Sequence, residues 1–168
     1  LTVCAVLKDS GVKLDDRLTK EEVSKPPWAG RMELVKDNLY VDGAHNPQGI
    51  RSFVDSVDSL YESEKLSDAT LLFSVVSDKN YDQMIKIFCE CKHFKCVYVT
   101  MTGGVRRLSS EIIKQAFEAH LPGISIEIFD SVDGAVHEWD NGLMFATGSL
   151  YLVGDVVRAL ERKENNHD

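Results

Sequence analysis

From residue 38 onward, short apolar segments alternate with segments of helical periodicity, and this alternation constrains the fold more than any other feature of the chain. The apolar segments end at polar residues or glycine, as buried parallel strands do. They occupy residues 39–41, 71–76, 96–101, 124–129 and 143–146. Because strands that alternate with helices form βαβ units, the sequence predicts a Rossmann-like α/β domain, in which a mainly parallel sheet carries helices on both faces.

Local signals mark the start of the sheet and of two helices. Apolar residues flank Lys36-Asp37-Asn38, which indicates that the sheet begins with an antiparallel strand. The pair Asn46-Pro47 provides an N-cap and an N1 proline for one helix, and Asn80 with Gln83 forms a cap-and-N3 pair for the next. Helical periodicity also predicts helices around residues 50–61, 112–117, 132–139 and 153–160.

This pattern covers residues 28–160, and the two ends of the chain differ from it. Residues 1–27 contain helix-like segments, with Gly11 as a stop signal, but they have no place in the alternation. We expect them to be the remnant of a preceding domain and its linker, so that the chain is a piece of a longer protein. Residues 161–168 are charged and rich in amides, which predicts a frayed tail.

Charge and hydropathy exclude several classes of partner. The chain has 168 residues, of which 19 are Lys or Arg and 27 are Asp or Glu, so its net charge is −8. A protein that binds nucleic acid or an acidic membrane requires a basic face instead. The longest uncharged apolar stretch, residues 142–154, is shorter than the roughly 20 residues that a membrane helix needs. We therefore expect a cytoplasmic, monomeric protein without a nucleic-acid or membrane partner.

Three cysteines lie close together but do not have the spacing of a metal site. Cys89, Cys91 and Cys96, with His93 between them, form C-x-C-x₄-C rather than the paired C-x₂-C of structural zinc sites. They also span the end of a predicted helix and the start of a strand, which separates the thiols. The sequence therefore predicts reduced, inert thiols and no metal site.

Ligands of an open parallel sheet bind outside the carboxyl ends of its strands, and this rule selects a set of polar loops. The loops comprise residues 42–46, 77–79, 102–104, 130–131 and 147–149. The first and the last precede helices, whose N-terminal amides favour anions. The sequence has no G-x-x-x-x-G-K-[ST] phosphate loop, no G-x-G-x-x-G, no G-x-S-x-G, no H-E-x-x-H and no C-x-x-C. A complete catalytic apparatus is therefore not expected in this chain.

Four segments occur in an order and spacing that resembles the carboxyl-terminal domain of folylpolyglutamate synthase. They are WAGR at 28–31, DGAHNP at 42–47, SDKNY at 77–81 and TGSLYLVG at 147–154. That enzyme family, often bifunctional with dihydrofolate synthase, belongs to the Mur ligase superfamily. The resemblance covers residues 28–154 and makes residues 1–27 similar to the last helix of the central ATPase domain and the linker.

The resemblance implies an ATP-dependent carboxylate–amine ligase of folate biosynthesis and one-carbon metabolism, a tetrahydrofolate:L-glutamate ligase. The γ-phosphate of ATP activates a folate carboxylate as an acyl phosphate, the amine of L-glutamate attacks it, and phosphate leaves. The phosphate loop, the Mg²⁺ ligands and most of the folate site belong to the preceding ATPase domain of the parent protein. The domain seen here is implied to contribute nucleotide contacts and the glutamate site, and to be inactive alone.

The resemblance also assigns roles to individual residues. Arg31 and Asp42 match residues that contact ATP, and His45 would orient the attacking glutamate or the acyl phosphate as a catalytic residue. Lys79 and Ser149 match the amino-acid site of Mur ligases and would hold the carboxylates of glutamate. A guanidinium and a carboxylate suit phosphate and ribose oxygens, respectively. The ordinary alternatives are a surface arginine, a turn aspartate, a capping or packing histidine and a solvated lysine.

Two other functions fit the same residues. Another Mur-type amino-acid ligase, such as a peptidoglycan-precursor ligase, would share the fold, although the DGAHN segment at 42–46 favours the folate branch. A non-catalytic Rossmann-like module that binds a nucleotide or a protein would need none of the catalytic assignments.

Overall fold

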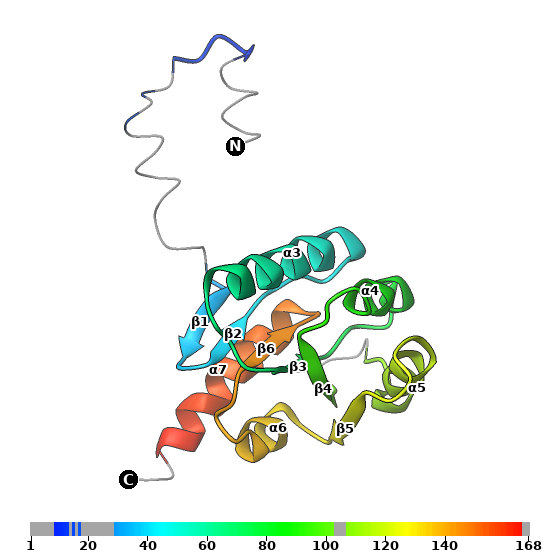
Figure 1. Cartoon of the computed structure of the whole chain (residues 1–168). Helices are drawn as coiled ribbons and strands as arrows, with labels where there is room; N and C mark the ends of the chain where they lie inside the picture. Colours follow the sequence, from blue (N-terminus) through cyan, green and yellow to red (C-terminus); the bar gives the residue numbers. More distant parts are fainter. Residues whose placement is uncertain (1–8, 14, 16, 18–28, 103–106, 166–168) are drawn as a thin grey trace.

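The computed structural model describes residues 9–13, 15, 17, 29–102 and 107–165, and its strands form a single sheet (Figure 1). Within these residues the sheet has six strands in the order β1-β2-β6-β3-β4-β5. Their bounds are Glu33–Lys36 (β1), Leu39–Val41 (β2), Ala69–Phe73 (β3), Phe94–Thr100 (β4), Ser125–Phe129 (β5) and Met144–Thr147 (β6). β1 pairs with β2 in the antiparallel sense, and the other pairs are parallel. The predicted Rossmann-like architecture is confirmed.

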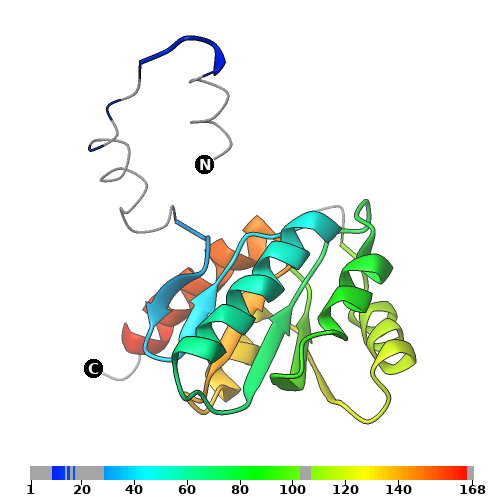
Figure 2. The ribbon, with the colours of Figure 1, turned by 45° about the horizontal axis from the view of Figure 1, so that its top comes forward.

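Helices cover both faces of the sheet. They are α3 (Pro47–Ser63), α4 (Tyr81–Phe88), α5 (Ser110–His120), α6 (Val132–Glu138) and α7 (Leu150–Asn165). Figures 1 and 2 show α3, α4 and α5 along one face and α6 and α7 along the other. Each face has its own hydrophobic core, so Phe73 packs with the first set of helices and its neighbour Leu72 with the second. This alternation follows from the two-residue period of a strand.

The predicted helix caps and the hairpin are present in the structure. The Asn46 side chain accepts a hydrogen bond from the Gly49 amide at 2.8 Å, and Asn80 accepts one from the Gln83 amide at 3.3 Å. In the turn between β1 and β2, Asn38 has φ = +66°, a left-handed conformation that asparagine tolerates. These features depend on residues that are close in sequence, which is why the sequence alone predicts them.

The third strand ends earlier than its apolar run. β3 stops at Phe73, whereas the sequence predicts a strand over residues 71–76. Val75 is buried although it lies outside the strand, because the chain continues along the core after the ladder ends. Ser74 lies at this point, and its amide is 3.4 Å from the carbonyl oxygen of Thr147 on the neighbouring strand.

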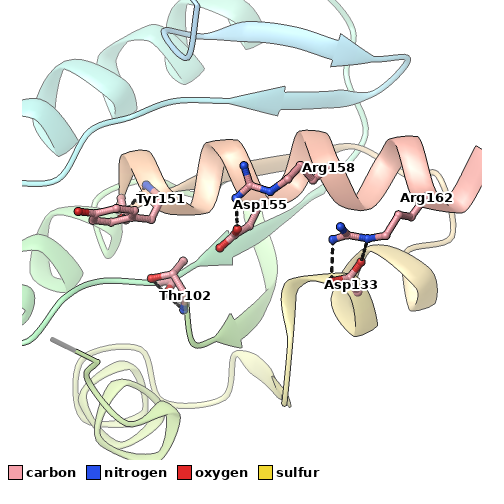
Figure 3. Close-up of polar contacts among 8 residues, drawn as sticks. Thr102, Asp133, Tyr151, Asp155, Arg158 and Arg162 are labelled. Atoms are coloured by element: carbon pink, nitrogen blue, oxygen red, sulfur yellow. Dashed lines mark hydrogen bonds and ion pairs between the residues drawn. The ribbon is translucent and has the colours of Figure 1, made fainter. Parts of the chain in front are cut away.

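The last helix extends beyond its predicted end. Residues 161–165, where we expected a frayed tail, are helical and are held to α6. Arg162 donates to both carboxylate oxygens of Asp133, at 2.7 and 3.0 Å (Figure 3). Lys163 Nζ donates to the carbonyl oxygens of Val136 and Trp139, at 2.9 and 3.2 Å, and thereby caps the end of α6.

Most of the segment before the sheet is outside the described residues. The helices predicted within residues 1–8 and 19–26 belong to this part. Gly11, the predicted stop of the first, has φ = +80°, as a helix-terminating glycine does.

Burial favours the protonated thiol at Cys89, Cys91 and Cys96. Burial raises the pKa of Cys91 to about 11, and it also raises the pKa values of Cys89 and Cys96. His93 stacks on Tyr61 and bonds to a carboxylate rather than to the thiols. Among the described residues, no three His, Cys, Asp or Glu side chains are arranged to hold a metal ion. In the same part of the chain, no helix combines the length and apolar character needed to cross a membrane.

Gly148 provides a test of how closely β3 and β6 approach each other. Its φ is +112°, and a Cβ atom there would lie 2.4 Å from the Ser74 carbonyl oxygen. We expect Gly148→Ala to lower the free energy of unfolding by about 2–5 kcal/mol, because left-handed strain adds to overpacking against backbone. Gly123 is a matched control, since it has φ = +93° with nothing within 4 Å, so Gly123→Ala should cost only about 1–2 kcal/mol. Urea denaturation of the three chains measures this, and equal losses would contradict the close approach.

Candidate functional site

The site lies at the carboxyl edge of the sheet, where the chain diverges to the two faces. β6 lies between β2 and β3. The helices that follow β2 and β3 cover one face, whereas the helix that follows β6 covers the other. Such a divergence is the topological switch point at which open α/β sheets bind ligands. The structure therefore brings the predicted loops at 42–46, 77–79 and 147–149 to neighbouring strand ends.

A cavity of about 560 Å³ opens at this edge, between residues 29–32, the loop at 42–46 and the first turns of α3. Arg31, Asp42 and His45 all line it. The structure therefore brings together three of the five residues selected from the sequence, although Arg31 and Asp42 are eleven positions apart. Lys79 and Ser149 do not line this cavity.

The Asp42 carboxylate organises one wall of the cavity. One carboxylate oxygen accepts the Met32 amide at 2.9 Å, and the other accepts the Ala44 amide at 2.8 Å. Met32 has φ = +42°, which is unusual for a residue with a long side chain and is found where surrounding contacts stabilise it. Each carboxylate oxygen has a second lone pair, so Asp42 can hold the loop and still accept ligand hydroxyls.

The His45 ring is fixed by its own loop. Its Nδ1 lies 2.8 Å from the carbonyl oxygen of Gly43. A carbonyl oxygen only accepts, so Nδ1 carries the proton in this hydrogen bond. In the neutral ring Nε2 is then an acceptor, available to a donor group of a ligand.

Two positive features of the cavity attract anionic groups, beside the negative charge of Asp42. The cavity lies at the N-terminus of α3, a helix of 17 residues with no acidic residue in its first turn. The positive end of the helix dipole and the exposed Arg31 guanidinium both attract negative charge. Gln48 and Ser52, from the first two turns, add polar groups to the lining.

Lys79 and Ser149 lie at the ends of the adjacent strands β3 and β6, outside the cavity. Lys79 is half-buried in the turn before α4, where its amide donates to the Val76 carbonyl oxygen at 3.2 Å. Ser149 is 3% exposed, and its Oγ accepts the Tyr151 amide at 3.1 Å in the first turn of α7. Ser149 therefore caps α7, a role that we did not predict from the sequence.

Two residues at this edge were not predicted from the sequence. Leu150, 62% exposed, lines the cavity and packs so closely on Gly43 that a Cβ atom there would lie 2.3 Å from Leu150 Cδ2. Nothing in the sequence indicates that Leu150 is exposed, because it is one of several apolar residues at the start of an amphipathic helix. Ser74 lies inside the run that we assigned to a strand, so its position at the strand end was missed.

The carbonyl group of Ala44 joins the loop at 42–46, which lines the cavity, to the loop at 147–149 before α7. The Ala44 carbonyl oxygen accepts the Gly148 amide at 3.0 Å and lies 3.5 Å from the Thr147 hydroxyl. The loop that carries Asp42 and His45 is therefore attached to the loop that carries Ser149.

Comparisons with known proteins identify relatives of this arrangement. The chain is 27% identical over 161 residues to the dihydrofolate synthase/folylpolyglutamate synthase of Bacillus subtilis, covering 92% of this chain and 35% of the relative. Escherichia coli FolC in complex with ADP has a similar structure, with a TM-score of 0.78 and 18% identity over 98% of this chain and 39% of that one. A bifunctional folylpolyglutamate synthase/dihydrofolate synthase with Mn, AMPPNP and L-glutamate bound has a TM-score of 0.72 and 24% identity, covering 95% and 38%.

This chain thus spans between a third and two fifths of the length of these relatives. The model of the family described as "Mur ligase, glutamate ligase domain" matches residues 30–153, which is more than half of the chain. The match begins at the cavity wall and ends in the first turn of α7, so it includes all five residues selected from the sequence. The chain belongs to the glutamate ligase domain family of the Mur ligases.

Proposed function

We propose that this chain is the C-terminal domain of an ATP-dependent ligase that adds L-glutamate to the γ-carboxylate of folate. The observation that carries the proposal is the convergence of Arg31, Asp42 and His45 on one cavity, in a chain of the glutamate ligase domain family. The relatives support the choice of substrates, since their names are those of folate-extending synthases and one solved structure contains L-glutamate with AMPPNP.

In the proposed reaction, ATP phosphorylates a folate carboxylate, and the amine of glutamate displaces phosphate from the acyl phosphate. Arg31 would bond nucleotide oxygens with its permanently charged guanidinium. The free lone pairs of Asp42 would accept the ribose hydroxyls. His45 Nε2 would accept a hydrogen bond from the attacking amine and orient it, while Lys79 and Ser149 would hold the glutamate carboxylates.

The described residues contain no group of three His, Cys, Asp or Glu side chains that could hold Mg²⁺. We therefore place the Mg²⁺ ligands, the phosphate loop and most of the folate site in the preceding ATPase domain of the parent protein, which is proposed to be a cytoplasmic monomer.

The fold does not separate this function from that of other Mur ligases. UDP-N-acetylmuramate-alanine ligase MurC from Thermotoga maritima has a TM-score of 0.68 to this chain at 17% identity. The two functions differ in the substrates of the parent protein. They are distinguished by assaying the parent with folate and with UDP-linked acceptors, each in combination with a panel of amino acids.

The first prediction concerns the chain without its parent. We expect the 168-residue chain to release no phosphate from ATP, Mg²⁺, folate and glutamate, because it contains no phosphate loop. The full-length parent, assayed alongside, should release phosphate that depends on both folate and glutamate. Phosphate release that copurifies with the isolated chain would contradict the proposal that the ATPase domain is required. A parent protein that releases no such phosphate would favour a non-catalytic binding module.

The second prediction concerns Asp42. Asn at this position cannot accept both backbone amides and loses the charge, so Asp42→Asn in the parent should raise KM for ATP roughly ten- to a hundredfold. KM for glutamate should change far less. Asp37→Asn, in the exposed turn between β1 and β2, is the matched control. Steady-state kinetics with each substrate varied separately measures both values, and an unchanged KM for ATP would remove Asp42 from the nucleotide site.

The third prediction concerns the amino-acid site. Lys79→Ala and Ser149→Ala in the parent should each raise KM for glutamate while KM for ATP barely changes, and the two effects should be non-additive because both groups share one ligand. Ser149→Ala also removes a helix cap, so Ser131→Ala is its control. Ser131 caps α6 at the same sheet edge, with its Oγ accepting the Gly134 amide at 3.1 Å. If Ser131→Ala has the same kinetic effect, Ser149 acts only as a cap.

A further inference from the structure

We infer that Ser74 is a positioning residue for the amino-acid site, because it joins the loop that carries Lys79 to the loop that carries Ser149. This inference rests on the proposed function and adds a residue to it. Ser74 lies directly after β3, is 1% exposed and has its hydroxyl bonded to Thr102, so we assign it a positioning role and no ligand contact. Its effect on the site must pass through the groups that it holds.

The backbone of Ser74 is in contact with the loop between β6 and α7. Its amide lies 3.4 Å from the Thr147 carbonyl oxygen, and its own carbonyl oxygen occupies the space beside Gly148. Ser149 follows immediately. The position of Ser149 relative to β3 is thus set by packing against the backbone of Ser74, with a separation that only glycine at position 148 permits.

The side chain of Ser74 is bonded to the segment that leaves β4. Its Oγ accepts the Thr102 amide at 3.1 Å and lies 3.5 Å from the Thr102 hydroxyl. Figure 3 shows Thr102 on this segment at the edge of the sheet, with Tyr151 in the first turn of α7. Thr102 is 4% exposed, so the bond is protected from water and an unpaired partner would be costly.

A second contact holds the same segment nearer to Lys79. Val76, two residues after Ser74, forms an antiparallel bridge with Arg107, which lies before α5. The carbonyl oxygen of Val76 accepts the Lys79 amide at 3.2 Å. The segment that leads from β3 to Lys79 is therefore held at two points, by Thr102 at Ser74 and by Arg107 at Val76.

These contacts give Ser74 two separable roles. Its backbone restrains the Ser149 loop, whereas its hydroxyl, bonded to Thr102, anchors the start of the segment that carries Lys79. Removing the hydroxyl should leave the packing against Gly148 in place and loosen only the Lys79 side. The consequence for a dicarboxylate ligand is weaker binding, since one of its two proposed partners is less well placed.

The test is Ser74→Ala in the full-length parent. We expect KM for glutamate to rise roughly two- to tenfold, as expected for the loss of one buried hydrogen bond, with KM for ATP unchanged. Thr102→Val keeps the backbone amide that donates to Ser74 Oγ and removes only the hydroxyl contact at 3.5 Å, so its effect should be smaller than that of Ser74→Ala. Ser74→Thr, which keeps the hydroxyl at position 74, should retain the original KM for glutamate.

Ser110→Ala is the matched control. Ser110 is another buried serine near this edge, 2% exposed at the start of α5, and its hydroxyl has no hydrogen-bond partner in the described part of the chain. Its removal should leave KM for glutamate unchanged. An equal effect of Ser110→Ala, or an equal rise in KM for ATP in Ser74→Ala, would show general loosening and overturn the positioning role.

The outcomes separate this inference from the proposed function. If Lys79→Ala raises KM for glutamate and Ser74→Ala does not, the positioning role is wrong and the proposed amino-acid site stands. If neither Lys79→Ala nor Ser149→Ala alters glutamate saturation, both the site and the inference are wrong. Should Ser74→Ala not fold, Ser74→Cys, which replaces the hydroxyl with a weakly bonding thiol, is compared with Ser74→Thr, and equal KM values for glutamate would overturn the positioning role.

Discussion

The close contact between β3 and β6 at Gly148 is the constraint on which the candidate site depends. Because β6 inserts between β2 and β3, the ends of three strands from distant parts of the sequence meet at one edge. Only a residue without a side chain fits at position 148, and the Gly148 amide donates a hydrogen bond to the carbonyl oxygen of Ala44 in the loop after β2. One glycine thus allows the three loops that carry Asp42, Lys79 and Ser149 to approach each other.

The Asp42 carboxylate shows how a site residue can also be structural. Its bonds to the amides of Met32 and Ala44 join the segment before β1 to the loop after β2. Arg31 is next to Met32, so the carboxylate that is proposed to accept ribose hydroxyls also positions the backbone from which the Arg31 side chain extends. A substitution there changes two ligand contacts at once, which is why the comparison of substrates is more informative than the loss of activity alone.

The sequence predicts those features that depend on neighbouring residues or on a regular period. The caps at Asn46 and Asn80, the hairpin turn at Asn38 and the parallel sheet belong to this class, and so does the edge at which the site lies. The end of β3 at Phe73 was not predictable, because Val75 is buried by packing rather than by strand pairing. The cavity shared by Arg31, Asp42 and His45 could be expected only from the family resemblance, since it depends on a bond between Met32 and a residue ten positions away.

The bonds from Lys163 to the last carbonyl groups of α6 bear on how this half of the domain folds. α6 has only seven residues, too few to be stable as an isolated helix in water. Its C-terminal carbonyl groups accept hydrogen bonds from Lys163 in the last turn of α7, and Asp133 in the first turn of α6 is bonded to Arg162, also in the last turn of α7. α6 therefore becomes complete only after the far end of α7 has docked. The two helices form one cooperative unit, which opens and closes as a whole although β6 separates them in the sequence.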